Sequence, residues 1–335
     1  MSPPTGPLAD SGPANPYEAL LAQWSDMQAA LGFLLHKPLL SADFTAKVRQ
    51  CDQWLQDLVA QDIDATLYLI FQLASGNGTG YSVSHALVCA ALCHMLAQEL
   101  GLPRRERDSL VRAAFTMNIG MTRLQDELAE RADPISAQQQ NAVDQHARHG
   151  TELLEQAGVD DALWLASVAQ HHAAPRHHAR EPLRSLQPQE RLTHILATVD
   201  RYAAFISPRR SRAGRSATES IRTLLGKNVS SNDEVGFMLL RTIGLYPPGT
   251  FVKLDNGDTA IVLRRGESSH FPVVASLLDT RGEAHPEPAL HFTSQGKPHV
   301  AGALPSSAVS MGANHHTMVR MGLIAASRQP VPAHA

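Results

Sequence analysis

The sequence has 335 residues, 43% of them hydrophobic, and a formal net charge of −3. This length and composition allow one large domain or two smaller ones with a hydrophobic core. The near-neutral charge argues against a DNA partner, and no apolar run reaches the roughly 18 residues that a transmembrane helix requires.

Three cysteines, Cys51, Cys89 and Cys93, form an odd set without the spacing of a disulfide framework. The N-terminus has neither a basic segment nor an apolar segment of the secretory kind. These features are typical of a reduced, cytoplasmic protein.

Hydrophobic periodicity and breakers divide the chain into five parts. Apolar residues recur at helical spacing from Tyr17 onward, with a break expected near Gln61–Asp64, and the run Gly76–Gly80 ends this part. The predicted parts are a disordered lead (1–16), an N-terminal helical region (17–75), a helical domain (76–245), a small β element (246–295) and a mostly disordered tail (296–335).

The β element is predicted from alternating apolar residues around a turn. Two short strands, Thr250–Leu254 and Thr259–Arg264, flank Asn256-Gly257, which favours a hairpin with a type I′ turn. A third strand is expected within Phe271–Leu278. Beyond Thr293 no period is sustained, which is why the tail is predicted to be mostly disordered.

A pair of histidines ends the predicted helix that starts at Ala162. Trp164, Leu165 and Val168 give this helix one apolar face, and His171 and His172 close its last turn. Neutral imidazole is the commonest metal ligand in proteins, so the pair is a candidate metal site. The alternative is that both rings cap the last carbonyls of the helix, where the helix dipole favours them.

Other candidate ligands also fall on predicted helices. His85, Cys89 and Cys93 recur every four residues along one helix face, but cysteine ligands of zinc usually pair across a turn, so buried thiols in a helix interface are favoured. Asp200 lies at the edge of an apolar helix stripe, where an unpaired carboxylate is costly. A metal, an arginine or a helix N-terminus would satisfy it.

From about Tyr81 to Gly244 the chain resembles the HD-GYP family, the bacterial branch of the HD-domain phosphohydrolases, which hydrolyses cyclic di-GMP. The resemblance rests on the order and spacing of several motifs, not on any one of them. In chain order these are His85 with Gly101-Leu102, His146-x-x-x-Gly150 with Leu153-Leu154, His171-His172, Arg191 through Asp200, Ser207 with Arg209 and Arg212, and the hairpin that follows Tyr246-Pro-Pro-Gly249. The resemblance implies a mainly α fold: an HD-type helical bundle with extra N-terminal helices and a small C-terminal β element.

The departures from the family pattern concern its chemistry. Met117 and Asn118 stand where the family has its His-Asp pair, and Met121 replaces a lysine that contacts phosphate. Ala173 replaces a glutamate after the histidine pair, and Tyr81 stands one turn before His85 in place of a ligand glutamate. The Gly-Tyr-Pro loop is absent, and residues 174–182 have another sequence.

The resemblance implies a metal ligand set of five residues, His85, His146, His171, His172 and Asp200. Three histidines and a carboxylate suit one Fe, Mn or Zn ion. Two alternatives remain open. In one, the five residues form only a hydrogen-bonded polar core. In the other, a rebuilt site uses His94, His177 or His178.

Arg209 and Arg212 also have two readings. The resemblance implies that they grip substrate phosphates, which arginine can do with two parallel hydrogen bonds. As ordinary residues they belong to a solvated basic loop.

The sequence therefore predicts a degenerate HD-GYP signalling protein with lost or weak cyclic di-GMP phosphodiesterase activity. It would act by binding a nucleotide, such as cyclic di-GMP, or a partner protein, with the helices of residues 17–75 as a docking or homodimer face. The alternative is a metal-dependent phosphohydrolase that works on cyclic di-GMP or a related nucleotide with a reduced ligand set.

Overall fold

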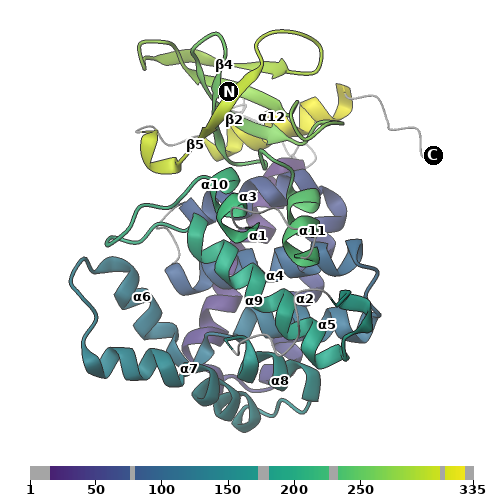
Figure 1. Cartoon of the computed structure of the whole chain (residues 1–335), viewed down its shortest axis with the longest axis vertical. Coiled ribbons are helices and arrows are strands. Elements are labelled where there is room, and N and C mark those ends of the chain that lie inside the picture. The colour runs from purple at the N-terminus through teal and green to yellow at the C-terminus, as the bar shows by residue number, and fades with distance from the viewer. Residues whose placement is uncertain (1–15, 76–79, 173–180, 226–232, 310–313, 329–335) are drawn as a thin grey trace, which may run out of the picture.

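The computed structural model describes residues 16–75, 80–172, 181–225, 233–309 and 314–328. It consists of a helical body with a smaller antiparallel β-sheet stacked on one end (Figure 1). The predicted fold class, mainly α with a small C-terminal β element, is confirmed. Residues 1–15 of the predicted lead lie outside the described residues, as do Ala173, His177 and His178.

The body is built of α-helices. Short 3-10 turns connect some of them, including η2 (Ile119–Met121). The α-helices are α1 (Pro16–His36), α2 (Phe44–Gln61), α3 (Ile63–Ser75), α4 (Tyr81–Glu99), α5 (Arg104–Thr116), α6 (Thr122–Glu130), α7 (Ala137–Gln156), α8 (Ala162–Gln170), α9 (Pro188–Ile206), α10 (Ala217–Leu225) and α11 (Glu234–Ile243).

The N-terminal helices pack onto the body through one apolar face. Trp24, Met27 and Leu31 of α1 are almost fully buried. The predicted break near Gln61–Asp64 is confirmed, because α2 ends at Gln61 and Asp62 caps α3 by accepting hydrogen bonds from the backbone N–H groups of residues 64 and 65. Most of the apolar surface of residues 17–75 is therefore used within the chain.

Helix α4 is the centre of the body. Its residues from Ser82 to Ala97 are all buried, and a helix that is buried on every side must be covered by neighbours all round. It packs against α3, α5, α9 and α11. His85 and Cys89 therefore lie inside the protein and not on a surface.

Two glycines allow a close approach between the turn η2 and helix α7. A Cβ atom added at Gly120 would lie 2.3 Å from the backbone O of His146 and 2.6 Å from the N of Gly150. No side chain fits at such distances. The His146-x-x-x-Gly150 spacing thus fixes α7, and with it His146, against the turn that follows Met117 and Asn118.

The sheet is antiparallel, with strand order β4-β3-β2-β1-β5. Side chains alternate between its two faces: Ile261 and Ala275 join the core of the helical body, whereas Val252, Val262 and Val274 form a second, small core. Its strands are β1 (Phe251–Leu254), β2 (Thr259–Arg264), β3 (Val273–Leu278), β4 (Ala284–Phe292) and β5 (Val300–Leu304).

The predicted hairpin is present, but its turn is not of type I′. A type I′ turn needs positive φ at both central residues, whereas Asn256 has no positive φ and Gly257 has φ 90°. The N–H of Gly257 donates to the O of Leu254, and the N–H of Leu254 donates to the O of Asp258. This is a turn followed by one left-handed glycine, the pattern of a G1 bulge.

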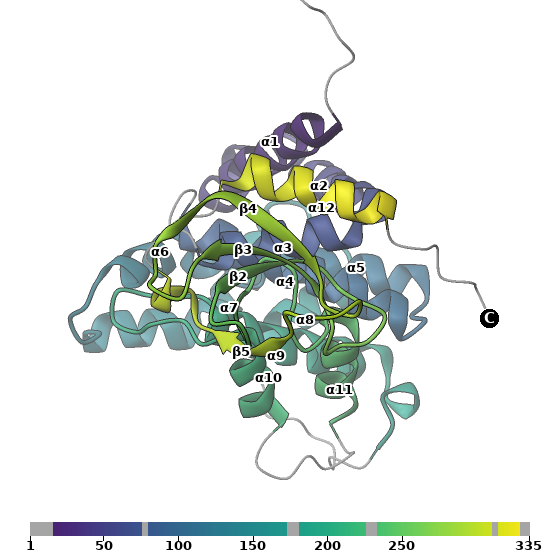
Figure 2. The ribbon, with the colours of Figure 1, turned by 90° about the horizontal axis from the view of Figure 1, so that it is seen from above.

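The prediction of a mostly disordered tail is wrong for two segments. Val300–Leu304 forms strand β5, which pairs with β1, and His315–Arg328 forms helix α12. Met318, Val319 and Ala325 bury one face of α12, which packs against α1, α3 and β2 (Figure 2). Burial of this face against distant elements stabilises a helix whose own composition is weak.

Buried ion pairs attach the sheet to the helical body. Arg264 at the end of β2 lies 2.7 Å from Asp62, and Arg265 lies 2.6 Å from Asp64 at the start of α3. The first pair is only 12% and 10% exposed, so both charges depend on each other for compensation. Within the described ranges, no helix is both long and apolar enough to cross a membrane.

Candidate metal centre

The structure divides the predicted ligands into two groups and adds a cysteine. One group contains His146, which lies on α7, and His171 and His172, which follow α8. The other group contains His85 and Cys89 of α4 and Asp200 of α9. Within each group the potential ligand atoms lie within 4.8 Å of one another.

In the first group, hydrogen bonds to the backbone fix two of the rings. The Nδ1–H of His146 donates to the O of Val143, and the Nδ1–H of His171 donates to the O of Val168 at 2.7 Å. A carbonyl can only accept, so both Nε2 atoms are the unprotonated nitrogens of neutral rings. Ligand histidines usually donate their other N–H in this way.

The two unprotonated nitrogens face each other in a buried place. His146 Nε2 and His171 Nε2 lie 3.2 Å apart, and both residues are at most 2% exposed. Two facing lone pairs repel unless a proton or a cation lies beside both. Two nitrogens bound to one metal at about 2.1 Å, with angles of 90° to 110°, stand about 3.0 to 3.4 Å apart, so the arrangement fits a shared metal.

Burial keeps these rings neutral. It lowers the pKa of His171 to about 4 and also lowers the pKa of His146. The third ring, His172, is exposed and lies 4.1 Å from His171 between ring centroids. At neutral pH His146 and His171 therefore offer unprotonated nitrogens, the form of imidazole that binds metal.

In the second group, a buried carboxylate meets an imidazole. The Nε2–H of His85 donates to Asp200 Oδ1 at 2.9 Å, and Cys89 Sγ lies 3.6 Å from the same nitrogen. Burial alone would raise the pKa of Asp200. The hydrogen bond and charge of His85, with the charges of His171 and His172, outweigh it and lower the pKa to about 2. Asp200 is therefore anionic at neutral pH.

A buried ion pair sets the position of Asp200. Arg191, near the start of α9, donates from two nitrogens to Glu106 of α5 at 2.8 to 3.0 Å, with 12% and 10% of the two side chains exposed. It also donates to the backbone O atoms of residues 183 and 186. The motif from Arg191 to Asp200 thus begins with an anchor and ends with a candidate ligand.

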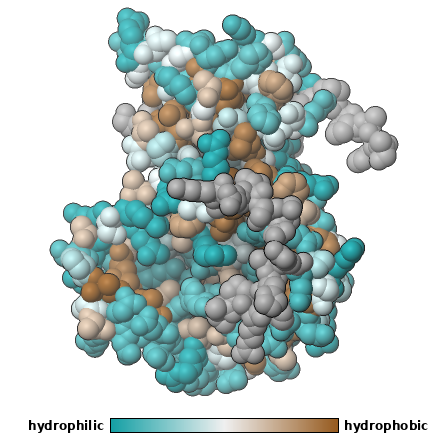
Figure 3. All heavy atoms as spheres, viewed as in Figure 1, coloured by the Kyte–Doolittle hydropathy of each residue, from teal (hydrophilic) through white to brown (hydrophobic). Residues whose placement is uncertain are grey.

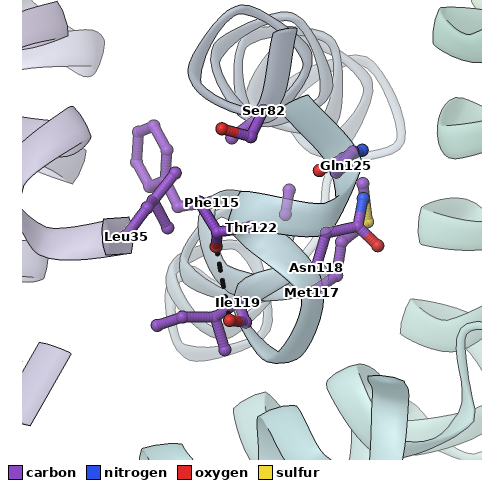
Figure 4. A pocket seen from close by; sticks show the side chains of 10 residues that line it. Leu35, Ser82, Phe115, Met117, Asn118, Ile119, Thr122 and Gln125 are labelled. Atoms are coloured by element: carbon purple, nitrogen blue, oxygen red, sulfur yellow. Dashed lines mark hydrogen bonds between the residues drawn. The ribbon is translucent and has the colours of Figure 1, made fainter. Parts of the chain in front are cut away.

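Met117 and Asn118 lie between α5 and η2. Met117 is 1% exposed, and both residues line a small cavity of about 10 Å³, which is room for about one water molecule. Figure 4 shows Leu35 on one side of this cavity and Met117 and Asn118 on the opposite side, while Thr122 donates to the O of Ile119. A thioether and a neutral amide occupy the place where the resemblance requires an imidazole and a carboxylate.

The two candidate phosphate ligands behave differently. Arg209 lies over the ring of Tyr81, 4.8 Å from its centroid, and donates to the Tyr81 hydroxyl at 3.1 Å. The Tyr81 ring in turn stacks on His85. Arg212 is exposed and donates to the backbone O of Ala204. Arg209 thus lies beside the stacked rings of Tyr81 and His85, and its buried Nε has no hydrogen-bond partner among the described residues.

Sequence reasoning did not anticipate the Tyr81–Arg209 contact, nor that Cys89 joins His85 and Asp200. The signal for Cys89 was its position one helical turn after His85. The alternative of a zinc site built on His85, Cys89 and Cys93 receives no support, because Cys93 is in neither group of potential ligands found among the described residues.

An open cleft of about 530 Å³ lies on another side of η2. Its walls come from the end of α1, the following 3-10 turn, η2, α6 and α7. Leu39 and Leu40 are 54% and 75% exposed beside it, and Figure 3 shows apolar residues gathered over α6. Its charged lining residues are Lys37 and Arg123, with His36 and His149, and it contains no acidic residue.

The fold and the two groups define a mainly helical protein with two clusters of side chains that could hold a metal ion. No family model matches the chain. A search of curated proteins finds similarity to the cyclic di-GMP phosphodiesterase PA4108 of Pseudomonas aeruginosa, with 27% identity over 209 residues, 61% of this chain and 49% of that protein. The chain thus spans about half the length of this relative.

Among solved structures, Bd1817, an HDG"Y"P protein from Bdellovibrio bacteriovorus, matches with a TM-score of 0.48 and 13% identity, covering 69% of this chain and 73% of that one. The predicted resemblance to the HD-GYP family is confirmed by the similarity to the cyclic di-GMP phosphodiesterase.

Proposed function

We propose that this chain is a degenerate HD-GYP signalling protein of the cytoplasm that acts by binding, with cyclic di-GMP hydrolysis lost or weak. The observation that carries the proposal is the pair Met117 and Asn118, which stands where the family has its His-Asp pair. Met117 is buried in an apolar cavity wall, and Asn118 carries no charge.

The chemical reason is the charge that a pair of metals requires. When bound, two divalent ions would hold the phosphate oxygens and activate water for attack. In the family that the chain resembles, the aspartate of the His-Asp pair bridges both ions. A neutral amide cannot offset their charge, so losing both residues removes ligands from each half of the site.

The ligand we propose is cyclic di-GMP or a related nucleotide. The similar protein from Pseudomonas aeruginosa is a cyclic di-GMP phosphodiesterase. Arg209 supports phosphate binding here, because its guanidinium lies over the Tyr81 ring that stacks on His85, and its buried Nε has no partner among the described residues. Arginine binds phosphate oxygens through such N–H groups.

A second candidate function is hydrolysis with the reduced ligand set. It is favoured by the facing Nε2 atoms of His146 and His171, 3.2 Å apart, which fit one Fe, Mn or Zn ion. A single ion could still polarise a phosphate oxygen, whereas the clamp formed by two ions would be incomplete.

Restoring the pair tests the proposal. The variant Met117→His/Asn118→Asp should gain cyclic di-GMP hydrolysis by a factor on the order of 100 or more over the wild type, because it supplies both missing ligands. Met117→Leu/Asn118→Leu is the matched control and should stay at the wild-type level. Efficient hydrolysis by the wild type, with no gain in the restored variant, would contradict the proposal.

We also propose that a partner protein binds in the cleft beside Leu39 and Leu40. The part that enters the cleft is an amphipathic helix with acidic residues along one side. The cleft has an apolar floor, and Lys37 and Arg123 on its rim have no ion-pair partner among the described residues. Apolar anchors in a groove with complementary charges at the rim are a common recognition mode. Within the predicted docking face of residues 17–75, we propose the end of α1 as the part that binds the partner.

A designed helical peptide with leucine anchors and a glutamate face is the probe for this cleft. We expect Arg123→Glu and Leu40→Ser each to weaken its binding roughly 10-fold, since each removes a contact of about 1.4 kcal/mol. Phe237→Ser, which changes another exposed apolar residue, on α11, is the control. Tighter binding of a lysine-faced peptide would refute the charge assignment, and self-association through the cleft would point to a homodimer.

A further inference from the structure

We propose that His85, Cys89 and Asp200 bind a zinc ion, with the Cys89 thiolate supplying the negative charge that Asn118 lacks. The inference deepens the proposed function and rests on its assignment of His85 and Asp200 as retained ligands. It adds Cys89, which no HD-GYP motif of this chain contains.

The distances around His85 Nε2 suit a tetrahedral zinc site. Zinc bound to nitrogen at about 2.1 Å and to sulfur at about 2.3 Å, at a tetrahedral angle, separates the two ligand atoms by about 3.6 Å. Cys89 Sγ lies 3.6 Å from His85 Nε2. Asp200 Oδ1 lies 2.9 Å from that nitrogen, so this contact has to open by about 0.4 Å.

Charge balance favours this group. One thiolate and one carboxylate together offset the two positive charges of zinc, so a neutral unit is buried. Three imidazoles offset none of that charge. In the family that the chain resembles, the second anion comes from the His-Asp pair, which is replaced here by Met117 and Asn118.

The type of ligand selects the metal. Thiolate is a soft ligand that favours zinc over manganese, and a set of sulfur, nitrogen and oxygen atoms is within the range that zinc accepts. The fourth position would remain for water or a ligand oxygen. Arg209, stacked on the Tyr81 ring that covers His85, stands on this side of the group.

Zinc binding moves two protons. The Cys89 thiol releases its proton to solvent, and the His85 proton leaves Nε2 for Nδ1. His85 Nδ1 is buried and has no partner among the described residues. The new N–H is therefore left without an acceptor inside the protein, a cost that the three metal bonds have to offset.

The test uses the full chain, loaded with Co²⁺ for spectroscopy and with Zn²⁺ for affinity. A thiolate bound to Co²⁺ gives a charge-transfer band in the near ultraviolet, which does not depend on activity. We expect this band in the wild type and in Cys93→Ala, the matched control, since Cys93 is equally buried on the same helix. Cys89→Ala should lose the band and bind Zn²⁺ roughly 100-fold more weakly, at least the loss seen for removal of an outer contact.

Two more variants distinguish loss of the metal-bound thiolate from misfolding, and one ligand group from the other. Cys89→Ser keeps the side-chain volume if the alanine variant does not fold, and it too should lack the band. His171→Ala/His172→Ala should keep the band, because the other group supplies no sulfur. A band that persists in Cys89→Ser, or a wild type without one, overturns the inference. Neither result touches the proposed loss of hydrolysis, which the Met117→His/Asn118→Asp variant tests separately.

Discussion

The ligand group on α7 and α8 contains three imidazoles, of which His172 is exposed, whereas the group on α4 and α9 combines an imidazole, a thiol and a carboxylate inside the body. The first group has the better prepared geometry, because backbone carbonyls hold two of its rings. The second group has the charge that better offsets a divalent cation, because it includes the carboxylate of Asp200. On the proposed assignment, loss of the His-Asp pair would weaken metal binding by the two groups unequally, since only the second group contains an anion of its own.

Removing the anion should have the largest effect. Asp200→Asn should weaken Zn²⁺ binding at the α4–α9 group by a factor on the order of 1000, about 4 kcal/mol, because a neutral amide replaces the buried charge. The measurement is competition with a chelator of known affinity. Asp144→Asn, an exposed carboxylate on α7, is the control. An unchanged affinity in Asp200→Asn would mean that metal binds only at the α7–α8 group.

The next largest effect should come from breaking the Arg191–Glu106 ion pair that anchors α9. Arg191→Ala should lower the free energy of unfolding by about 3 kcal/mol, because it leaves Glu106 buried without its partner. The thiolate–Co²⁺ band should weaken with it, since α9 positions Asp200. Urea denaturation measures the first effect, and Arg148→Ala, in an exposed pair, is the control. A loss below roughly 0.5 kcal/mol, the value for surface pairs, would argue against the anchor.

His94, a buried histidine outside both ligand groups, should make the stability of the protein depend on pH. Burial lowers the pKa of His94 from 6.5 to about 4, so the unfolded chain takes up a proton on acidification before the folded chain does. Stability should therefore fall as the pH drops from 6.5 toward 4, by about 2 kcal/mol between pH 7 and pH 5. His94→Gln should remove this part of the pH dependence in metal-free protein. Parallel curves for wild type and variant would refute the assignment.

The anchor of α8 should have the smallest effect. The Trp164 Nε1–H donates to Thr116 Oγ1 at 2.7 Å, in a fully buried contact between α8 and α5. Thr116→Val leaves this N–H unpaired and should cost about 1 kcal/mol of stability, whereas Thr116→Ser keeps the acceptor. The thiolate–Co²⁺ band should not change, because the contact supports the other group. A weakened band would show that the two groups are not independent.

Much of the site was predictable from local patterns. The histidine pair after α8, the break at Asp62 and the order of the helices follow from spacing and from punctuating residues. The division of the ligands into two groups was not predictable, because it depends on α4 packing against α9 and on α7 packing against η2 through Gly120 and Gly150. Those contacts join residues far apart in the sequence.

The features that the sequence prediction missed also depend on contacts between residues far apart in the sequence. Helix α12 was missed because its Gly, Ala, Ser and His content hides a short apolar face, Met318, Val319 and Ala325, that is stabilised only by distant partners. Strand β5 was missed because it pairs with β1, about 50 residues earlier, as sheet contacts often do. Tyr81 was interpreted only as a lost ligand, although it connects Arg209 with His85.

The most direct test of the account is a single-turnover assay of cyclic di-GMP hydrolysis with the wild-type chain in excess, loaded in turn with Zn²⁺, Mn²⁺ or Fe²⁺. The account predicts that the nucleotide is bound but stays intact with each metal, while the Met117→His/Asn118→Asp chain converts it to the linear product. Complete conversion by the wild-type chain, abolished by His171→Ala/His172→Ala, would contradict the account and establish a hydrolase with a reduced ligand set.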